Sequence, residues 1–247
     1  MNSRVMKLRL LATLATVLSA VACVGNGRLQ EGSLLTESRS VKLGQARKIR
    51  VELQMGAGEL QLAGGAKDLL EAEFAYASSR WKPQMDYSVT GAQGLLTIRQ
   101  PKGSSGPMGP GRNKWDLRLN DAVPVDLSVE LGAGESKLTL GSLSLTSFDL
   151  NTGVGETLVD LTGDLKNSLE ARIHGGVGQA TVQLPRNVGV RVHAEGGIGQ
   201  VRASQLKKEG DFYVNDMYGK SPVTLRVEVQ TGVGEIHLEA ADAPPVV

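Results

Sequence analysis

The motif Gly-x-Gly followed directly by Glu or Gln occurs six times along this 247-residue chain. The first glycines of four consecutive copies lie at positions 132, 153, 176 and 197, so the copies begin 21, 23 and 21 residues apart. A nearly constant period of this kind indicates a repeat architecture. The motif glycines are Gly56, Gly58, Gly132, Gly134, Gly153, Gly155, Gly176, Gly178, Gly197, Gly199, Gly232 and Gly234.

The segments on both sides of each motif alternate apolar and polar residues, which is the period of a β-strand. Leu127, Val129 and Leu131 lead into one motif, and Leu138 and Leu140 follow it. One strand–turn–strand unit cannot bury its apolar face alone, but stacked copies can. The sequence therefore predicts an all-β fold, a β-solenoid with rungs of about 22 residues. The structural turn glycines serve its corners, which need positive φ or leave no room for a Cβ.

An antiparallel β-sandwich is the alternative fold, with each Gly-x-Gly as a hairpin turn. The constant spacing and the constant Glu or Gln after each turn favour stacking. In a stack, equivalent residues of neighbouring rungs lie about 4.8 Å apart.

The first 22 residues have the pattern of a secretion signal. Three bases precede residue 10, and residues 10–22 carry no charge. This uncharged run is too short for a membrane-spanning helix, which needs about 20 residues. Cys23, the only cysteine, follows Ala20-Val21-Ala22 and resembles the acylated cysteine of a bacterial lipobox. We expect lipid attachment at Cys23 and a membrane anchor in the bacterial cell envelope, on the outer membrane or its periplasmic face. Ordinary secretion after Ala22 and an uncleaved anchor are the alternatives.

The predicted domain organisation follows from these segments. Residues 1–22 are a lipoprotein signal peptide, 23–45 a flexible tether, and 46–126 an N-terminal β region with a Gly/Pro-rich loop at 104–113. Residues 127–240 form the solenoid repeat domain, and 241–247 are a tail.

The repeats resemble the toast-rack superfamily. The resemblance rests on the Gly-[Val/Ala]-Gly-Glu motifs, on residues 115–119 ahead of 124–135, and on residues 184–192. This superfamily includes DUF2154-like and DUF4097-like adhesin domains and the C-terminal domain of LiaF-type cell-wall-active antibiotic response proteins. The resemblance implies a solenoid-like stack in a cell-envelope setting, and it supplies no catalytic residues.

The composition and the motifs argue against several kinds of chemistry. Without residues 1–22 the chain has 24 bases and 26 acids, so nothing indicates a nucleic-acid partner. Calcium-binding β-rolls need Asp two residues after the motif, where Ala180 and Val201 stand here. We therefore expect no metal, no cofactor and no catalytic residue.

Three further groups of residues are candidate sites. The column after the turns could bind a cation, although solvated side chains are the simpler interpretation: Glu59, Glu135, Glu156, Gln179, Gln200 and Glu235. His174 and His193 occupy equivalent places in consecutive repeats, so they could be neighbours in the stack. The aromatic residues outside the regular rungs could stack on a glycan but more simply cap the core: Tyr76, Trp81, Tyr87, Trp115, Tyr213 and Tyr218.

These observations predict a non-enzymatic envelope lipoprotein, adhesin-like or part of an envelope-stress response. Its partners would be the membrane, through Cys23, and an unknown envelope protein or polysaccharide. A β-helix-type carbohydrate-active enzyme and a self-assembling envelope scaffold are the alternatives.

Overall fold

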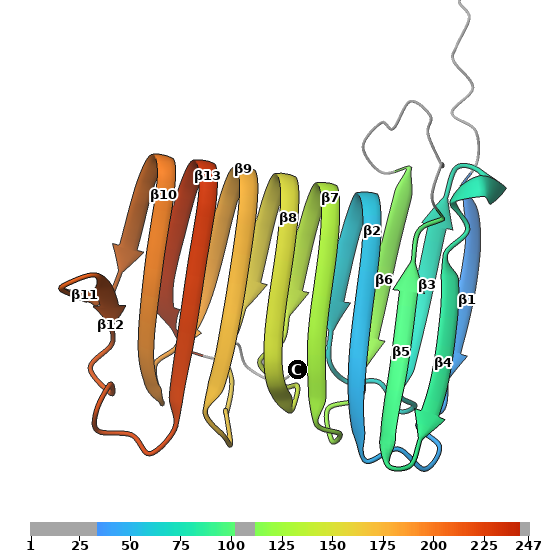
Figure 1. Ribbon diagram of the computed structural model, residues 1–247, viewed down its shortest axis with the longest axis horizontal. Coiled ribbons are helices and arrows are strands. Elements are labelled where there is room, and N and C mark those ends of the chain that lie inside the picture. Colours follow the sequence, from blue (N-terminus) through green and yellow to red (C-terminus); the bar gives the residue numbers. More distant parts are fainter. Residues whose placement is uncertain (1–33, 102–111, 243–247) are drawn as a thin grey trace, which may run out of the picture. The chain divides into compact units, whose positions relative to one another are not determined.

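The computed structural model describes residues 34–101 and 112–242, and this part of the chain consists of β-strands and their connections (Figure 1). Within it, the only helical element is a 3-10 turn at Ser79–Trp81. The strands are β1 (Leu35–Val41), β2 (Lys48–Ala63), β3 (Leu70–Tyr76), β4 (Gln84–Thr90), β5 (Gln93–Arg99), β6 (Asn113–Leu119), β7 (Val125–Thr139), β8 (Leu145–Asp160), β9 (Leu169–Pro185), β10 (Gly189–Ser204), β11 (Lys207–Glu209), β12 (Phe212–Val214) and β13 (Thr224–Ala241).

Six long strands carry the Gly-x-Gly motifs, and each bends into an arch (Figure 1). They are β2, β7, β8, β9, β13 and β10, with 15 to 18 residues each. Neighbouring arches pair in parallel with their motifs in register, so Gly134 lies opposite both Gly58 and Gly155. Because these pairings are parallel, the alternative interpretation of the motifs as antiparallel hairpin turns is wrong. The described strands form one large mixed sheet, in which the long strands are parallel.

The arches do not stack in chain order. Along the sheet the order is β2, β7, β8, β9, β13, β10, so the last arch of the sequence lies between β9 and β10. The segment between β10 and β13 contains the β11–β12 hairpin, and β12 pairs with the first half of β10. The chain therefore leaves the stack after β10 and returns to occupy an inner position.

Short strands complete the stack beside β2. The first half of β2 pairs with β5 and its second half with β6, both in parallel. Antiparallel pairs then extend the two layers, from β5 to β4 and from β6 through β3 to β1. Residues 35–41, predicted to belong to the flexible tether, form β1. Two of the inward residues of β1, Glu37 and Arg39, are charged, so this strand lacks the apolar alternation that marks the others.

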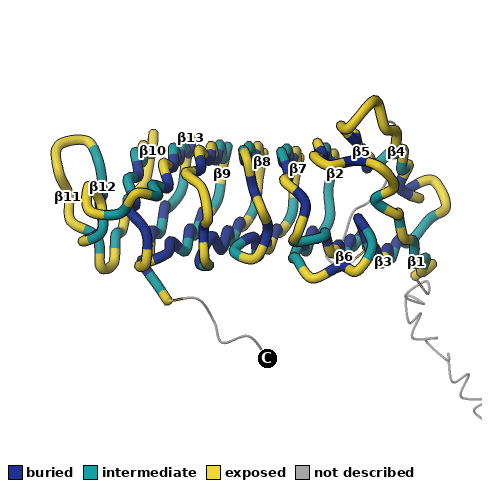
Figure 2. Tube along the Cα trace, turned by 90° about the horizontal axis from the view of Figure 1, so that it is seen from below, coloured by how far each residue is buried: buried dark blue, intermediate teal, exposed yellow. Residues whose placement is uncertain are grey.

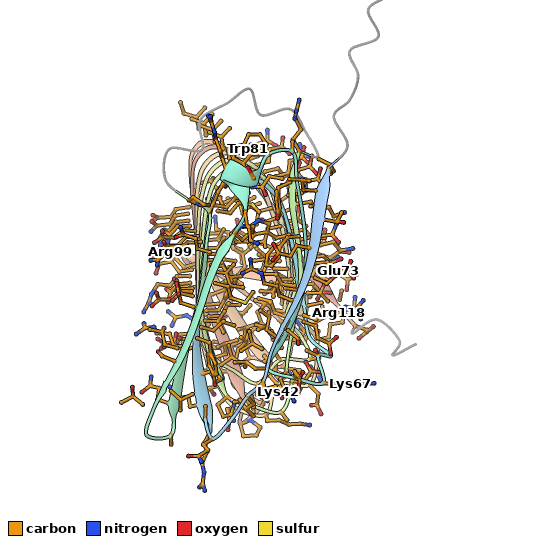
Figure 3. The ribbon with its side chains drawn as sticks, turned by 90° about the vertical axis from the view of Figure 1, so that its right-hand side faces the viewer. Lys42, Lys67, Glu73, Trp81, Arg99 and Arg118 are labelled. Atoms are coloured by element: carbon orange, nitrogen blue, oxygen red, sulfur yellow. The ribbon has the colours of Figure 1, made fainter. Side chains whose placement is uncertain are left out.

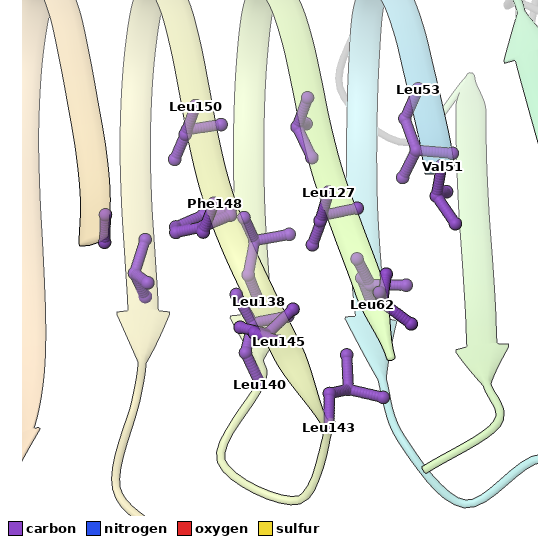
Figure 4. Close-up of a cluster of buried hydrophobic side chains, with 14 of the residues drawn as sticks. Val51, Leu53, Leu62, Leu127, Leu138, Leu140, Leu143, Leu145, Phe148 and Leu150 are labelled. Carbon is purple, nitrogen blue, oxygen red and sulfur yellow. The ribbon is translucent and has the colours of Figure 1, made fainter. Parts of the chain in front are cut away.

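The core lies between the two halves of the arches, where inward side chains from both layers meet (Figures 2 and 4). Leu127 and Phe148 are fully buried there, and full burial of such a side chain stabilises the fold by about 1.5–3 kcal/mol. At the β1 end, the rings of Phe74 and Trp115 pack edge to face with centroids 5.7 Å apart. Trp81 is also buried at this end (Figure 3). These aromatic side chains therefore fill the core where the arches stop.

Candidate functional site

The two glycines of each motif allow the arches to lie directly against one another. Gly134 has φ of +135°, and a Cβ there would lie 1.9 Å from the carbonyl oxygen of Gly58. A Cβ on Gly132 would lie 2.3 Å from the carbonyl oxygen of Gly56. Real Cβ atoms do not approach backbone that closely, so any side chain at these positions would push the arches apart. The same contacts recur from arch to arch along the stack.

The middle residue of each motif points outward and forms a line along the tops of the arches. Val154, Val177, Val233 and Ile198 are successive neighbours in register, with exposed fractions of 55%, 49%, 42% and 71%. We call these four residues the arch ridge. Adjacent strands lie about 4.8 Å apart, so the four side chains form a continuous apolar strip. The sequence shows Val and Ile in the motifs, but only the arch geometry shows that they face solvent.

The column that follows the motifs lies on one outer face, in the order Glu59, Glu135, Glu156, Gln179, Glu235, Gln200. The amide of Gln179 thus separates the run of three glutamates from Glu235, an order that consecutive stacking would not produce. Lys114 Nζ lies 4.0 Å from Glu59 Oε2 at the beginning of the column. Glu135 and Glu156 in its middle are exposed.

Glu235 is held by basic side chains. His237 Nε2 lies 2.8 Å from Glu235 Oε2, and Arg202 Nη2 lies 3.3 Å from Glu235 Oε1. The hydrogen bond from His237 and the charge of Arg202 lower the pKa of Glu235. In residues 34–101 and 112–242, no three or more His, Cys, Asp or Glu side chains are grouped so that they could hold a metal ion. The column is therefore a solvated row with basic partners.

The structure separates His174 from His193. Strand β13 lies between their strands, so His174 faces Gln230 and His193 faces Glu228. His193 Nε2 instead lies 3.5 Å from Glu195 Oε1 of its own strand. The prediction that His174 and His193 are neighbours is wrong, because β13 lies between β9 and β10.

Rows of polar side chains cover both outer faces. One row contains Gln54, Glu130, Asn151 and His174 in successive strands. These four residues line a hollow of ≈510 Å³ beside the glycines of the motifs. On the opposite face, part of the glutamate column lines a hollow of ≈370 Å³. The arrangement is that of broad, repetitive surfaces with chemically similar side chains at a constant spacing.

Cys23 and the predicted signal peptide lie outside the described residues, as does most of the Gly/Pro-rich loop at 104–113. Among the residues that the structure does describe, no helix has the length and apolar character needed to cross a bilayer.

Comparison with known families shows that residues 30–183 match the N-terminal domain of toast_rack, DUF2154. No curated protein matches the chain significantly.

Two solved structures are similar to different degrees. A "putative cell adhesion protein" from Clostridium sporogenes ATCC 15579 is 36% identical with a TM-score of 0.81, covering 84% of this chain and 100% of that one. A "putative adhesin" from Bacteroides fragilis NCTC 9343 is 12% identical, covering 83% of this chain and 96% of that one. Its TM-score of 0.30 is too low to establish a common fold.

Proposed function

The chain belongs to the toast_rack family, and on that premise we propose that it is a non-enzymatic cell-envelope lipoprotein whose outer surface contacts an envelope protein or a polysaccharide. The solved relative from C. sporogenes, described as a "putative cell adhesion protein", supports a contact role. In this proposal the stack of arches acts as a β-solenoid, a rigid support that holds many side chains at one spacing.

One observation supports this function best: the arch ridge, with polar rows on the two faces below it. Val154, Val177, Val233 and Ile198 form a continuous exposed apolar strip, whereas monomeric proteins normally expose such residues singly. A partner that itself repeats can make the same weak contact at several arches, and the contacts then reinforce one another. A single catalytic centre would instead need different groups converging on one point.

The lipid anchor is the second part of the proposal. Residues 1–22 would be removed, Cys23 would be acylated, and the residues from 24 to β1 would serve as the tether. Because each buried methylene contributes about 0.8 kcal/mol, two or more acyl chains would hold the stack at a membrane surface stably.

Expression of the full chain with its own leader in a bacterial host tests the anchor. We expect wild type to partition into detergent with the mass of an acylated chain beginning at Cys23, and Cys23→Ala to remain aqueous. If both proteins are aqueous and begin at residue 23, the chain is secreted and the lipoprotein proposal is wrong. A turnover activity that is lost on changing one polar residue would contradict the non-enzymatic part.

Self-assembly is a second candidate function, favoured by one edge of the sheet. The second half of β10, residues 196–204, pairs with β13 on one side, and no described strand pairs with its other side. An open edge of this length can accept a strand from another chain. Light scattering across a wide concentration range tests this candidate: a rising mass supports it, and a constant monomer mass rejects it.

A further inference from the structure

Two arginines lie side by side on the outer face near the β10 end of the stack. Arg191 of β10 and Arg226 of β13 are opposite one another in register. Within residues 34–101 and 112–242, neither guanidinium forms an ion pair. Like charges directly opposite one another destabilise a sheet. On its other side, Arg226 lies opposite Glu170 of β9, so the charge of the pair is partly compensated within the sheet. Two adjacent guanidinium groups that form no close ion pair can still donate hydrogen bonds to an anion.

Phe212 forms an apolar wall beside this pair. Strand β12 pairs with β10 so that Phe212 lies opposite His193, and the Cζ of Arg191 lies 3.5 Å from the centroid of the Phe212 ring. The ring therefore holds the guanidinium of Arg191 by a cation–π contact. The imidazole of His193 lies 5.5 Å from the same ring. Arg191 is thus oriented by packing, whereas the guanidinium of Arg226 can reach a ligand.

These side chains line a hollow of ≈230 Å³ on the outer surface. Its charged lining consists of three arginines and two glutamates, beside His193. The third arginine, Arg172, is already paired with Asp149, with Nη1 and Oδ1 3.1 Å apart. The two remaining arginines, Arg191 and Arg226, are matched in number by Glu170 and Glu228. A lining of this kind suits a ligand with a single negative charge and several hydroxyl groups better than a doubly charged phosphate.

We propose that this hollow binds a carboxylate-bearing sugar residue of an acidic polysaccharide. The guanidinium groups of Arg191 and Arg226 would donate paired hydrogen bonds to the carboxylate, which matches their planar geometry. The stacked Arg191 guanidinium and Phe212 ring would form one wall of the site, and Glu170 and Glu228 would accept hydrogen bonds from the hydroxyl groups of the sugar. The inference rests on the proposed function and narrows its polysaccharide partner to an acidic one.

Titration calorimetry of the full chain in detergent tests the inference with oligogalacturonate, a sialylated oligosaccharide and a neutral oligosaccharide of equal length. We expect wild type to bind at least one acidic oligosaccharide, more weakly at high salt. We expect no detectable binding of the neutral oligosaccharide. Whether the uronate or the sialylated probe binds distinguishes the two sources of the carboxylate.

Arg226→Gln is the decisive variant, because within the described residues Arg226 makes no ion pair whose loss would disturb the fold. It should weaken binding at least about tenfold, since it removes charge-assisted hydrogen bonds. Arg99→Gln is the matched control: Arg99 lies at the opposite end of the stack and is paired with Asp86, with Nη2 and Oδ2 3.2 Å apart. It should bind as wild type does.

Three outcomes would overturn the inference: no binding of either acidic probe, equal binding of the neutral probe, or an Arg226→Gln variant that binds as wild type. Binding that survives Arg226→Gln would reject this site while leaving a polysaccharide-contact function intact. Binding of none of the three oligosaccharides would reject the polysaccharide partner, leaving contact with an envelope protein to be measured separately.

Discussion

The Oε1 atom of Gln100 accepts a hydrogen bond from the backbone N–H of Gly56, with a donor–acceptor distance of 2.9 Å. The same oxygen accepts from the N–H of Ala57 and from Nδ2 of Asn113, each at 3.2 Å. Asn113 Nδ2 also donates to the carbonyl oxygen of Ala57 at 2.8 Å. In each of the other five long strands, the preceding long strand of the stack lies on the side that Gln100 and Asn113 occupy beside β2. Two amide side chains therefore complete the first arch in place of a neighbouring strand.

Replacing Gln100 by Leu should destabilise the fold by about 1–2 kcal/mol. The substitution removes the acceptor of the N–H groups of Gly56 and Ala57 and one of the two acceptors of the Asn113 amide, so these donors lose hydrogen bonds. Urea unfolding measures the change. Gln93→Leu, at an exposed position of β5, should stay within about 0.5 kcal/mol of wild type. Equal stability of both variants would show that Gln100 does not support the arch.

Gly155→Ala should destabilise the fold on the order of 3–5 kcal/mol or prevent folding. Gly155 has φ of +140°, and a Cβ there would lie 1.8 Å from the carbonyl oxygen of Gly134. Backbone strain and overpacking therefore act together. Gly91→Ala is the control, because Gly91 also has positive φ but has open space around it. It should cost only about 1 kcal/mol. Thermal unfolding of both variants measures the two losses of stability. Similar losses for Gly155→Ala and Gly91→Ala would contradict close contact between the arches.

Glu37 should make the fold sensitive to acid. Hydrogen bonds to Arg39, and then to Lys82 and Tyr76, lower the pKa of Glu37 from 4.5 to about 2. The unfolded chain therefore binds the proton more readily than the folded one. The stability due to this group is present above pH 4.5 and is lost as the pH falls from 4.5 towards 2.

Urea unfolding at pH 6 and pH 3 of wild type and Glu37→Gln measures this contribution. Because Glu37 is partly exposed, we expect wild type to lose about 1–2 kcal/mol more than the variant. The control is Glu73→Gln, on the exposed side of β3, which should follow wild type. If wild type and Glu37→Gln lose the same free energy of unfolding between pH 6 and pH 3, the prediction is wrong.

Removing two members of the arch ridge should change the surface without changing the fold. Ile198→Ser combined with Val233→Ser replaces side chains that are 71% and 42% exposed, so the free energy of unfolding should change by about 1 kcal/mol or less. Retention on a hydrophobic-interaction column should fall clearly. Val89→Ser, at a 40% exposed position of β4 away from the ridge, should lower retention much less. Equal effects would show that the ridge does not act as one apolar strip.

Much of the architecture was predictable from local patterns. The two-residue alternation around each motif predicted strands with one buried face, and Leu127, Val129 and Leu131 are buried as that period requires. Strand β1 was not predicted, because its inward residues Glu37 and Arg39 are charged. They form ion pairs and a hydrogen bond with each other and with Lys82 and Tyr76. Such a strand becomes visible only when its partners are in place.

Some candidate surfaces were predictable from the sequence, whereas others depend on the tertiary structure. The glutamate column was visible in the repeats, but the pair formed by Arg191 and Arg226 was not, because 35 residues separate them in the chain. Only the insertion of β13 next to β10 brings them together. Phe212 lies outside the motifs, and it reaches Arg191 through the pairing of β12 with β10.

The sequence by itself determined the element type and the toast-rack likeness, because alternation and glycine spacing act within one repeat. It predicted two strands joined by a turn in each repeat, whereas the structure has one continuous strand that bends at the motif. The tertiary structure alone decided the order of the arches, the separation of His174 from His193 and the exposure of the arch ridge. The physical reason is that all six arches share one register and one kind of interface. A local pattern therefore shows that the arches stack, whereas which arch lies beside which depends on the connections between them.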